Sequence, residues 1–306
     1  MQRTANPCTP VRFRPQPPLI MNKIMKVGII GYGFVGKALE SALRKVDVIK
    51  IDPRLGTTIQ DLEEFNSDII FVSVPTPMKK DGNQDLRILF NVLEDISKSS
   101  INALVVIKST ILPIHLQDLF KIYSKIVINP EFLTERNATE DFINSKLIIF
   151  GGTSSLCDEI SNFYRNHTAC IESVHHFTDP ITACFVKYSI NSFLASKVIF
   201  FNELKVLFDK SSSKDSWKKF TNLLSIDERI GSTHMSVPGH DNRLGFGGAC
   251  FPKDTNAFIK YSEEVNAKLN LLDEVVRINN KIRSSYKNQT NREQDQNISF
   301  DIEEIN

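Results

Sequence analysis

The sequence predicts an α/β fold in which a Rossmann-type, doubly wound parallel sheet is followed by an all-α domain. Three observations support this prediction. Short apolar runs alternate with helical patterns in the first half of the chain, and a glycine-rich turn follows the first run. From residue 178 the alternation stops, and a helical pattern continues to Lys210.

Six apolar runs have the length and composition of buried strands. They lie at residues 25–30, 46–51, 69–74, 104–107, 126–128 and 147–150. Helical patterns separate them; one begins near Asp85, where Leu86, Leu89, Leu93 and Ile96 recur at helical spacing. Strands that alternate with helices indicate βαβ units, and therefore a parallel sheet.

These patterns divide the chain into a dinucleotide-binding domain at residues 25–177 and a helical domain at residues 178–286. Residues 1–24 are rich in proline and arginine and contain no apolar segment of signal-peptide length, so we expect a disordered tail; a transit peptide is the alternative. The start of the protein could equally be Met1, Met21 or Met25. Residues 287–306 are polar, and we expect a second tail.

The composition excludes several classes of protein. Lys and Arg number 37 against 36 Asp and Glu, a net charge of +1, which argues against a nucleic-acid binder. We find no apolar run of about 18 residues, so we expect no membrane span. The five cysteines show no CxxC spacing and the six histidines show no ligand spacing. We therefore expect free thiols in the cytoplasm, and no metal.

The motif Gly31-x-Gly33-x-x-Gly36 follows the first strand run and opens a helix. These glycines allow a tight turn, close approach of a pyrophosphate and packing of the helix on the sheet. Asp52 ends the second strand run, where a carboxylate accepts hydrogen bonds from ribose hydroxyls and repels a 2′-phosphate. This predicts NAD rather than NADP, although Arg54 could instead hold a 2′-phosphate. A glycine-rich turn without a ligand is the alternative.

Further polar residues follow later strand runs. Thr76 and Pro77 follow the third run, and Thr110 follows the fourth; such strand ends bind ligands, but ordinary turns have the same composition. Glu131 and Glu135 follow the fifth run, and either could act as a general base or simply favour a helix N-terminus.

Lys187 and Asn191 are four residues apart on the long predicted helix and share a mostly apolar face. A lysine and an amide there suit the stabilisation of negative charge on oxygen, while a lysine reaching solvent from a domain contact is the alternative.

The segment from Gly245 to Asp254 (GFGGACFPKD) places Cys250 after a glycine turn and before a predicted helix. The helix N-terminus and Lys253 are expected to lower the pKa of this thiol and favour the thiolate. A buried structural cysteine, the usual alternative, fits the other four cysteines better.

The motifs GYGFVG, VPTP, KST, NPEFLTE, VKYSINSFLASKVIFFNE and GFGGACFPKD occur in an order that resembles the nucleotide-sugar dehydrogenases of the UDP-glucose 6-dehydrogenase type. The resemblance covers residues 25–283, and we expect a short form without the family's C-terminal UDP-binding domain. It departs from the family at Cys184, Arg136 and Lys146, which stand where the family usually has glutamate, glycine and arginine.

The resemblance implies oxidation of the sugar C6 alcohol to a carboxylate by two NAD⁺, through a thiohemiacetal and a thioester on Cys250. The implied catalytic residues are Cys250, Lys187, Asp254, Asn191, Glu131 and Thr110. The implied cofactor-binding residues are Gly31, Gly33, Phe34, Val35, Gly36, Asp52, Thr76, Pro77 and Thr110. The implied substrate-binding residues are Phe132, Leu133, Glu135, Lys187, Asn191, Arg229, Phe246 and Gly247.

The resemblance also implies a homodimer through the long helix near residues 178–210, with Arg229 reaching the neighbouring subunit's nucleotide sugar. UDP-glucose is the expected substrate; GDP-mannose and UDP-N-acetylhexosamines are the alternatives within the family. A truncated NAD-binding relative of low or no activity, working with a partner chain, and a single-step 3-hydroxyacid or 6-phosphogluconate-type dehydrogenase are the alternatives outside it.

Overall fold

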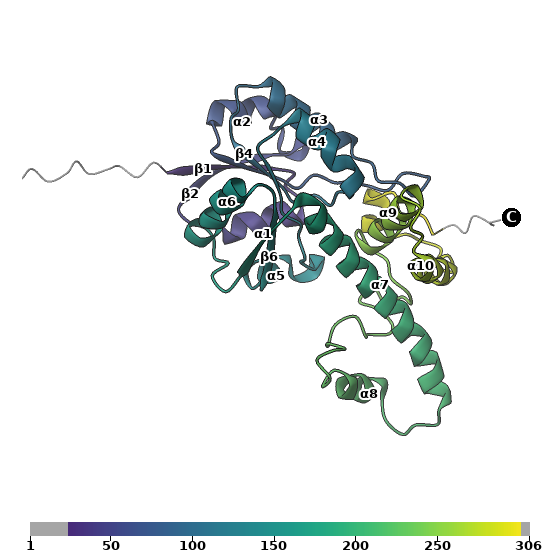
Figure 1. Ribbon diagram of the computed structural model, residues 1–306. Coiled ribbons are helices and arrows are strands. Elements are labelled where there is room, and N and C mark those ends of the chain that lie inside the picture. Colours follow the sequence, from purple (N-terminus) through teal and green to yellow (C-terminus); the bar gives the residue numbers. More distant parts are fainter. Residues whose placement is uncertain (1–23, 301–306) are drawn as a thin grey trace, which may run out of the picture.

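A computed structural model describes residues 24–300, and its centre is a seven-stranded sheet (Figure 1). The expected tail at residues 1–24 lies outside the described residues except for its last position. The strands are β1 (Met25–Ile30), β2 (Val46–Ile51), β3 (Ile69–Val72), β4 (Leu104–Ile107), β5 (Ile126–Ile128), β6 (Leu147–Gly151) and β7 (Val174–Thr178). Their order across the sheet is β2-β1-β3-β4-β5-β6-β7.

The first five strands are parallel, and β6 turns against them. Gly28 of β1 faces Ile49 of β2 on one side and Ile70 of β3 on the other. β6 pairs antiparallel with β5 at Ile128 and Gly151, and β7 then runs parallel to β6. The doubly wound fold is therefore confirmed, with a mostly parallel sheet. The sequence analysis did not predict β7, an edge strand whose residues are polar or partly exposed.

Helices cover both faces of the sheet, as the term doubly wound requires (Figure 1). One apolar core lies under α2 (Ile59–Phe65), α3 (Arg87–Lys98) and α4 (Leu116–Ile122). The opposite core lies under α1 (Phe34–Ala42), α5 (Ala138–Ile143) and α6 (Ser154–His167). The short 3₁₀ helices η1 (Pro53–Leu55), η2 (Pro113–His115) and η3 (Glu135–Asn137) follow β2, β4 and β5 respectively.

The helical part is built on α7 (Pro180–Lys210), which leaves the sheet and runs away from it (Figure 1). Helices α9 (Phe251–Glu264) and α10 (Asn270–Arg283) pack on α7 around a third apolar core, while α8 (Trp217–Leu224) lies near its far end. By length and composition α7 is the one helix among residues 24–300 that could cross a membrane, but core helices of soluble proteins pass the same test. Buried polar residues on α7, including Lys187 and Asn191, fit a core helix.

The C-terminal segment corrects the prediction of a polar tail beginning at residue 287. Residues up to 300 fold onto the body and contain α11 (Asn291–Asp295). Glu293 is fully buried against the side chain of Arg283, and Ile298 and Phe300 pack with Met78. Packing partners that lie far away in the sequence therefore order a segment whose own composition is polar.

Candidate active site

The turn between β1 and α1 has the backbone that the glycine motif predicts. Gly31 has a φ of +85°, and a Cβ atom there would lie 2.7 Å from the carbonyl oxygen of Ser73. A Cβ atom on Gly36 would lie 2.5 Å from the carbonyl oxygen of Gly31. Gly33 caps α1 without a side-chain hydrogen bond, and no atom lies within 4 Å of the position of its absent Cβ. This open space beside Gly33, at the N-terminus of α1, fits a pyrophosphate.

Asp52 lies at the end of β2, beside this turn, and is almost fully buried. Its Oδ2 accepts a hydrogen bond from the backbone N–H of Tyr32 at 2.8 Å, which joins it to the glycine turn. The guanidinium of Arg54 donates to both carboxylate oxygens at 3.0 Å. Arg54 holds the pKa of Asp52 well below its usual range. Because the Arg54 side chain is largely exposed, it can turn away when ribose hydroxyls compete for the carboxylate.

The next two strand ends carry Thr76, Pro77 and Thr110, as predicted. Thr76 is buried, whereas Thr110 is partly exposed. The side chain of Gln84 fixes the Thr110 loop, donating to the Thr110 carbonyl at 2.6 Å and accepting from the N–H of Leu112 at 3.3 Å. Sequence reasoning missed Gln84, since its partners lie 26 and 28 positions away.

Lys187, Asn191 and Asp254 form one hydrogen-bonded chain between α7 and α9. All three side chains are buried. The Asn191 Nδ2 donates to Asp254 Oδ2 at 2.5 Å, and the Lys187 ammonium donates to Asn191 Oδ1 at 3.4 Å and to the backbone carbonyl of Glu131 at 2.6 Å. The chain therefore joins the helical domain to the loop after β5. Its donors are fixed in place, which is what the stabilisation of a developing oxyanion requires.

Cys250 caps the N-terminus of α9, directly beside this chain. Burial raises the pKa of its thiol, and the positive charges of Lys187 and Lys253 act in the opposite direction without outweighing burial. The prediction of a lowered pKa is therefore wrong for this structure. The main reason is burial, and the negative charge of Asp254, which pairs with Lys253 at 2.5 Å, raises the pKa of Cys250 further.

Two asparagines hold the glycine turn that precedes Cys250. Asn279 is fully buried; it accepts from the N–H of Phe246 at 2.7 Å and donates to the carbonyl of Phe246 at 3.0 Å. Asn202 Oδ1 accepts from the N–H of Gly245 at 3.0 Å. Gly245 has a φ of +72°, and a Cβ atom there would lie 2.6 Å from Asn279 Oδ1. Sequence reasoning missed both asparagines, because nothing local marks an amide that supports a distant loop.

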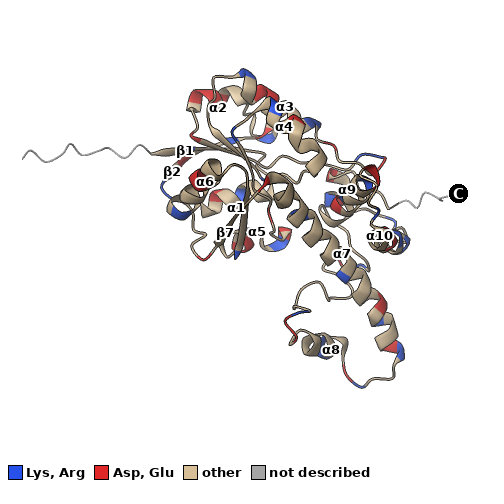
Figure 2. Cartoon of the chain, in the orientation of Figure 1, with Lys and Arg blue, Asp and Glu red and all other residues tan. Residues whose placement is uncertain are grey.

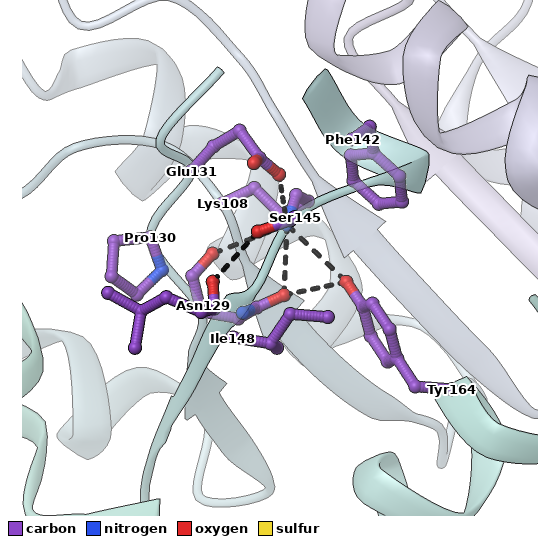
Figure 3. A pocket seen from close by; sticks show the side chains of 9 residues that line it. Lys108, Asn129, Pro130, Glu131, Phe142, Ser145, Ile148 and Tyr164 are labelled. Carbon is purple, nitrogen blue, oxygen red and sulfur yellow. Dashed lines mark hydrogen bonds and ion pairs between the residues drawn. The ribbon is translucent and has the colours of Figure 1, made fainter. Parts of the chain in front are cut away.

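The carboxylate of Glu131 and its backbone carbonyl contact different lysines. The carboxylate forms an ion pair with the buried ammonium of Lys108, with 2.9 Å between Oε2 and Nζ (Figure 3). Asn129 and Tyr164 surround the same ammonium (Figure 3). Lys108 belongs to the KST motif, but the sequence analysis assigned it no role.

Glu135 lies at the start of η3, close enough for its charge to act on Cys250. It forms an ion pair with Arg292 of α11. The Arg292 guanidinium lies 5.7 Å from the ring centre of Phe34, the first residue of α1. The C-terminal segment therefore bridges the dinucleotide turn and the loop after β5, and Glu293 extends this bridge to the N–H of Gly248 in the cysteine loop.

With this geometry established, we compared the chain with known proteins. The NAD-binding domain of the UDP-glucose/GDP-mannose dehydrogenase family matches residues 53–168, and the central domain of the same family matches residues 181–281. The two matches lie in order and together span more than half of the chain. The chain belongs to the UDP-glucose/GDP-mannose dehydrogenase family. The glycine motif and Asp52 lie just before the first match, at the N-terminal side of the family's NAD-binding domain.

The relatives agree with this assignment. The chain is 32% identical to the UDP-glucose 6-dehydrogenase of Rickettsia felis over 232 residues, which cover 73% of this chain and 50% of that protein. The structure of a UDP-glucose dehydrogenase from Pyrobaculum islandicum is 27% identical, with a TM-score of 0.69 over 84% of this chain and 68% of that one. The 3-hydroxyisobutyrate dehydrogenase of Mycobacterium tuberculosis shares the fold at 15% identity, with a TM-score of 0.64 over 90% and 97% of the two chains. The chain spans about half the length of the curated UDP-glucose 6-dehydrogenases that it matches.

Some of the predicted substrate-binding residues lie apart from the cluster of Cys250, Lys187, Asn191 and Asp254. Arg229 is highly exposed and pairs with Asp227 in the arm that follows α8, not with the site in its own chain. The ring of Phe246 is buried in the helical core. The ring centre of Phe132 lies 5.5 Å from the Lys187 ammonium, and Leu133 packs against the core under α1. A Cβ atom on Gly247 would collide with Arg283 and Glu293, so this glycine serves close packing in the structure.

Proposed function

We propose that the chain is a nucleotide-sugar dehydrogenase of the UDP-glucose 6-dehydrogenase type, which oxidises the C6 alcohol of the sugar to a carboxylate. The observation that carries the proposal is the position of Cys250, a thiol at a helix N-terminus beside the connected side chains of Lys187, Asn191 and Asp254. A dehydrogenase that makes only an aldehyde or a ketone needs no nucleophile. The curated UDP-glucose 6-dehydrogenases that the chain matches at 31–32% identity support UDP-glucose over GDP-mannose and UDP-N-acetylhexosamines.

The β1–α1 turn fits the cofactor. NAD⁺, when bound, accepts a hydride from the substrate carbon. The open space at Gly33 and the N–H groups of Phe34 and Val35 would hold its pyrophosphate, and Asp52 would hold a ribose. Thr76, Pro77 and Thr110 lie on neighbouring strand ends, where the remaining part of a dinucleotide passes in this type of sheet.

Each remaining step falls to residues of this chain. Asp254 and Thr110 orient a water. This water takes the proton from the C6 hydroxyl as the hydride leaves the C6 carbon. The Cys250 sulfur then adds to the aldehyde carbon, Lys187 and Asn191 stabilise the negative charge that develops on oxygen, and the thiol proton passes through the water held by Asp254 and Thr110 to that oxygen, which gives the thiohemiacetal. A second NAD⁺, when bound, would accept the hydride of the thiohemiacetal carbon; the hydroxyl proton would pass to the water held by Asp254 and Thr110, and Cys250 would then carry a thioester. Water cleaves the thioester, which releases the carboxylate and returns the thiol; Glu131 supports this step through its backbone carbonyl, which holds Lys187.

We propose in addition that two copies associate through α7. Between Pro180 and Asn202 the charged residues of this helix are Lys187 and Lys197, and both are buried. Figure 2 shows the consequence, a largely uncharged helix whose acidic residues gather toward its far end. The exposed large apolar residues of α7, which we call its apolar face, are Ile181, Phe185, Phe193, Phe200, Val206 and Leu207. A dimer on this face would also account for the exposed Arg229, which could reach the partner's substrate. The free thiols fit the cytoplasm.

Product stoichiometry tests the chemistry directly. We expect the wild-type protein to yield two NADH and one carboxylate per UDP-glucose. Cys250→Ser should keep NAD binding and lose steady turnover by several orders of magnitude, because a serine hydroxyl is hardly ionised at neutral pH. Cys170→Ser is the matched control, since its sulfur is buried in the sheet domain and donates to a carbonyl, as a hydroxyl can. Two NADH per sugar at a near wild-type rate from Cys250→Ser would remove the cysteine from the chemistry.

The same assay separates the other candidates. NAD binding without turnover on UDP-glucose, GDP-mannose or UDP-N-acetylhexosamines would favour an inactive relative that acts with a partner chain. One NADH per substrate, with an aldehyde or ketone released, would favour a single-step dehydrogenase such as those that share the fold.

A further inference from the structure

Lys108, at the end of β4, places a positive charge in the interior of the dinucleotide domain. Its side chain is 1% exposed. The ammonium lies 2.9 Å from Asn129 Oδ1, 3.4 Å from the hydroxyl of Tyr164 and 5.2 Å from the ring centre of Phe142. Figure 3 shows these groups converging on the ammonium around a cavity of about 10 Å³. A buried charge of this kind is tolerated only when a counter-charge and hydrogen bonds compensate it.

Glu131 supplies that counter-charge. Among the ion pairs of the described residues, Lys108 has this one carboxylate partner, at 2.9 Å. The neutral partners are themselves fixed, since Tyr164 donates to Asn129 Oδ1 at 2.8 Å and Asn129 donates to the carbonyl of Ile149 at 2.9 Å. Lys108 therefore has little freedom, and it holds the Glu131 carboxylate in one place.

The backbone of Glu131 reaches the catalytic side of the structure. Its carbonyl accepts a hydrogen bond from the Lys187 ammonium at 2.6 Å, shorter than the 3.4 Å contact between Lys187 and Asn191. One residue therefore joins two lysines, with its carboxylate on Lys108 and its carbonyl on Lys187. The closest polar contact that fixes Lys187 beside Cys250 depends on where the loop after β5 is anchored.

We propose that Lys108 is a positioning residue: by anchoring the Glu131 carboxylate, it fixes the Glu131 carbonyl and, through that carbonyl, the Lys187 ammonium beside Cys250. The inference rests on the proposed role of Cys250 as the nucleophile, but its test requires no turnover. Four charged groups act on the thiol, Lys187 from α7, Lys253 and Asp254 from α9, and Glu135 from η3. Lys108 is not one of them, so its influence on the thiol must pass through Glu131 and Lys187.

The experiment measures how the rate of alkylation of Cys250 by iodoacetamide depends on pH, with the Cys250 peptide followed by mass spectrometry. In Lys108→Met the anchor is lost and Lys187 moves away from the thiol. We expect the midpoint of the profile to rise by about one pH unit, which slows alkylation about tenfold below the midpoint. The matched control is Lys197→Met. It also removes a buried lysine, but Lys197 lies on α7 and its partners are the carbonyls of Ile230 and Gly231. Its profile should match the wild type.

Glu131→Gln distinguishes positioning of Lys187 from a direct electrostatic effect on the thiol. It also tests the proposal if Lys108→Met fails to fold. Removal of a negative charge would by itself lower the pKa of a nearby thiol, whereas release of Lys187 raises it. We expect a rise, in the same direction as for Lys108→Met. A lowered or unchanged midpoint in Glu131→Gln would overturn the proposal. Failure of the proposed function gives a different result: the alkylation midpoints of Lys108→Met and Glu131→Gln rise as expected, but the wild-type protein makes no NADH from any sugar nucleotide.

Discussion

At the scale of single residues, Asp52 shows how a predicted ligand-binding group can already have a partner. The sequence placed this carboxylate correctly, because the distance from the glycine motif to the end of β2 is regular in such folds. The position of the Arg54 side chain was not predictable from spacing, and it could have pointed toward a 2′-phosphate site or toward Asp52. In the structure it pairs with Asp52. The Arg54 guanidinium is exposed although Asp52 is buried, so the arginine can be exchanged for a ribose.

We therefore expect the protein to prefer NAD over NADP by at least about tenfold, or about 1.4 kcal/mol. Asp52→Ser should narrow this ratio, because it removes the repulsion of a 2′-phosphate and frees Arg54 to bind one. Binding of both cofactors by isothermal titration calorimetry gives the ratio. Asp85→Ser is a matched control: the Asp85 carboxylate likewise accepts the backbone N–H of the residue two positions on, Arg87, and pairs with its guanidinium, but Asp85 does not lie at the dinucleotide turn. A wild-type preference for NADP would show that Arg54, not Asp52, decides the choice.

Most of the site was predictable from the sequence, but the groups that support it were not. Cys250, Lys187, Asn191 and Asp254 stand in recognisable motifs, and the structure brings them together. Lys108, Asn279, Asn202 and Gln84 have partners at distant sequence positions that no local pattern identifies. The direction of the shift in the pKa of Cys250 was predicted wrongly for the same reason, since burial depends on the whole fold and outweighs the nearby lysines.

At the scale of elements, α11 was the main error. Its residues are polar, and a helix of five residues does not form by propensity alone. One signal was present, the capping box in which Thr290 and Glu293 satisfy each other's backbone N–H groups. The interaction that orders α11 could not be predicted from the sequence. It is the ion pair between Arg283 and Glu293, whose side chains are both fully buried. The strands of the sheet, in contrast, were predicted to within two residues at each end, except for β7.

Glu293 should make the stability of this segment depend on pH. Burial alone would raise the pKa of Glu293, but hydrogen bonds from Thr290 and the charge of Arg283 outweigh burial and lower it below the usual value. A carboxyl group whose pKa is lowered by folding stabilises the fold above its unfolded pKa, near 4.3, and loses that contribution as the pH falls through the folded pKa.

We therefore expect Glu293→Gln to destabilise the protein at pH 7 by about 3 kcal/mol, the range for removing one partner of a buried ion pair, and by much less at low pH. Urea unfolding at pH 7 and at a pH below the lowered folded pKa of Glu293 measures both values. Glu274→Gln is the control, because its partner Arg277 lies with it on the exposed face of α10. Equal destabilisation by Glu293→Gln at both pH values would mean that the carboxylate charge contributes nothing.

At the scale of the whole molecule, the sheet domain buries its apolar residues on both faces, whereas α7 does not. Phe193 is 64% exposed and Phe200 is 59% exposed, and other large apolar side chains of the same helix are exposed with them. Contiguous apolar surface of this kind on a soluble domain typically marks an interface. Lys187 and Asn191, for which we propose catalytic roles, are buried on the same helix, so one helix would serve both the proposed site and the association of two chains.

The oligomeric state of the wild-type protein and two variants tests this interface. We expect the wild type to sediment as a dimer. Phe193→Asp with Phe200→Asp should shift it to a monomer by raising the dissociation constant at least about 30-fold, because truncation of a central aromatic residue in an interface costs about 2 kcal/mol or more and the new charges would be buried. Leu271→Asp is the control, since Leu271 is 76% exposed but belongs to α10 and not to the apolar face of α7. If the interface also carries Arg229 to the partner's substrate, the monomeric variant should keep NAD affinity and lose affinity for UDP-glucose. A wild-type protein that remains monomeric at high concentration would leave the apolar face of α7 without this partner, and Arg229 without a role in the site.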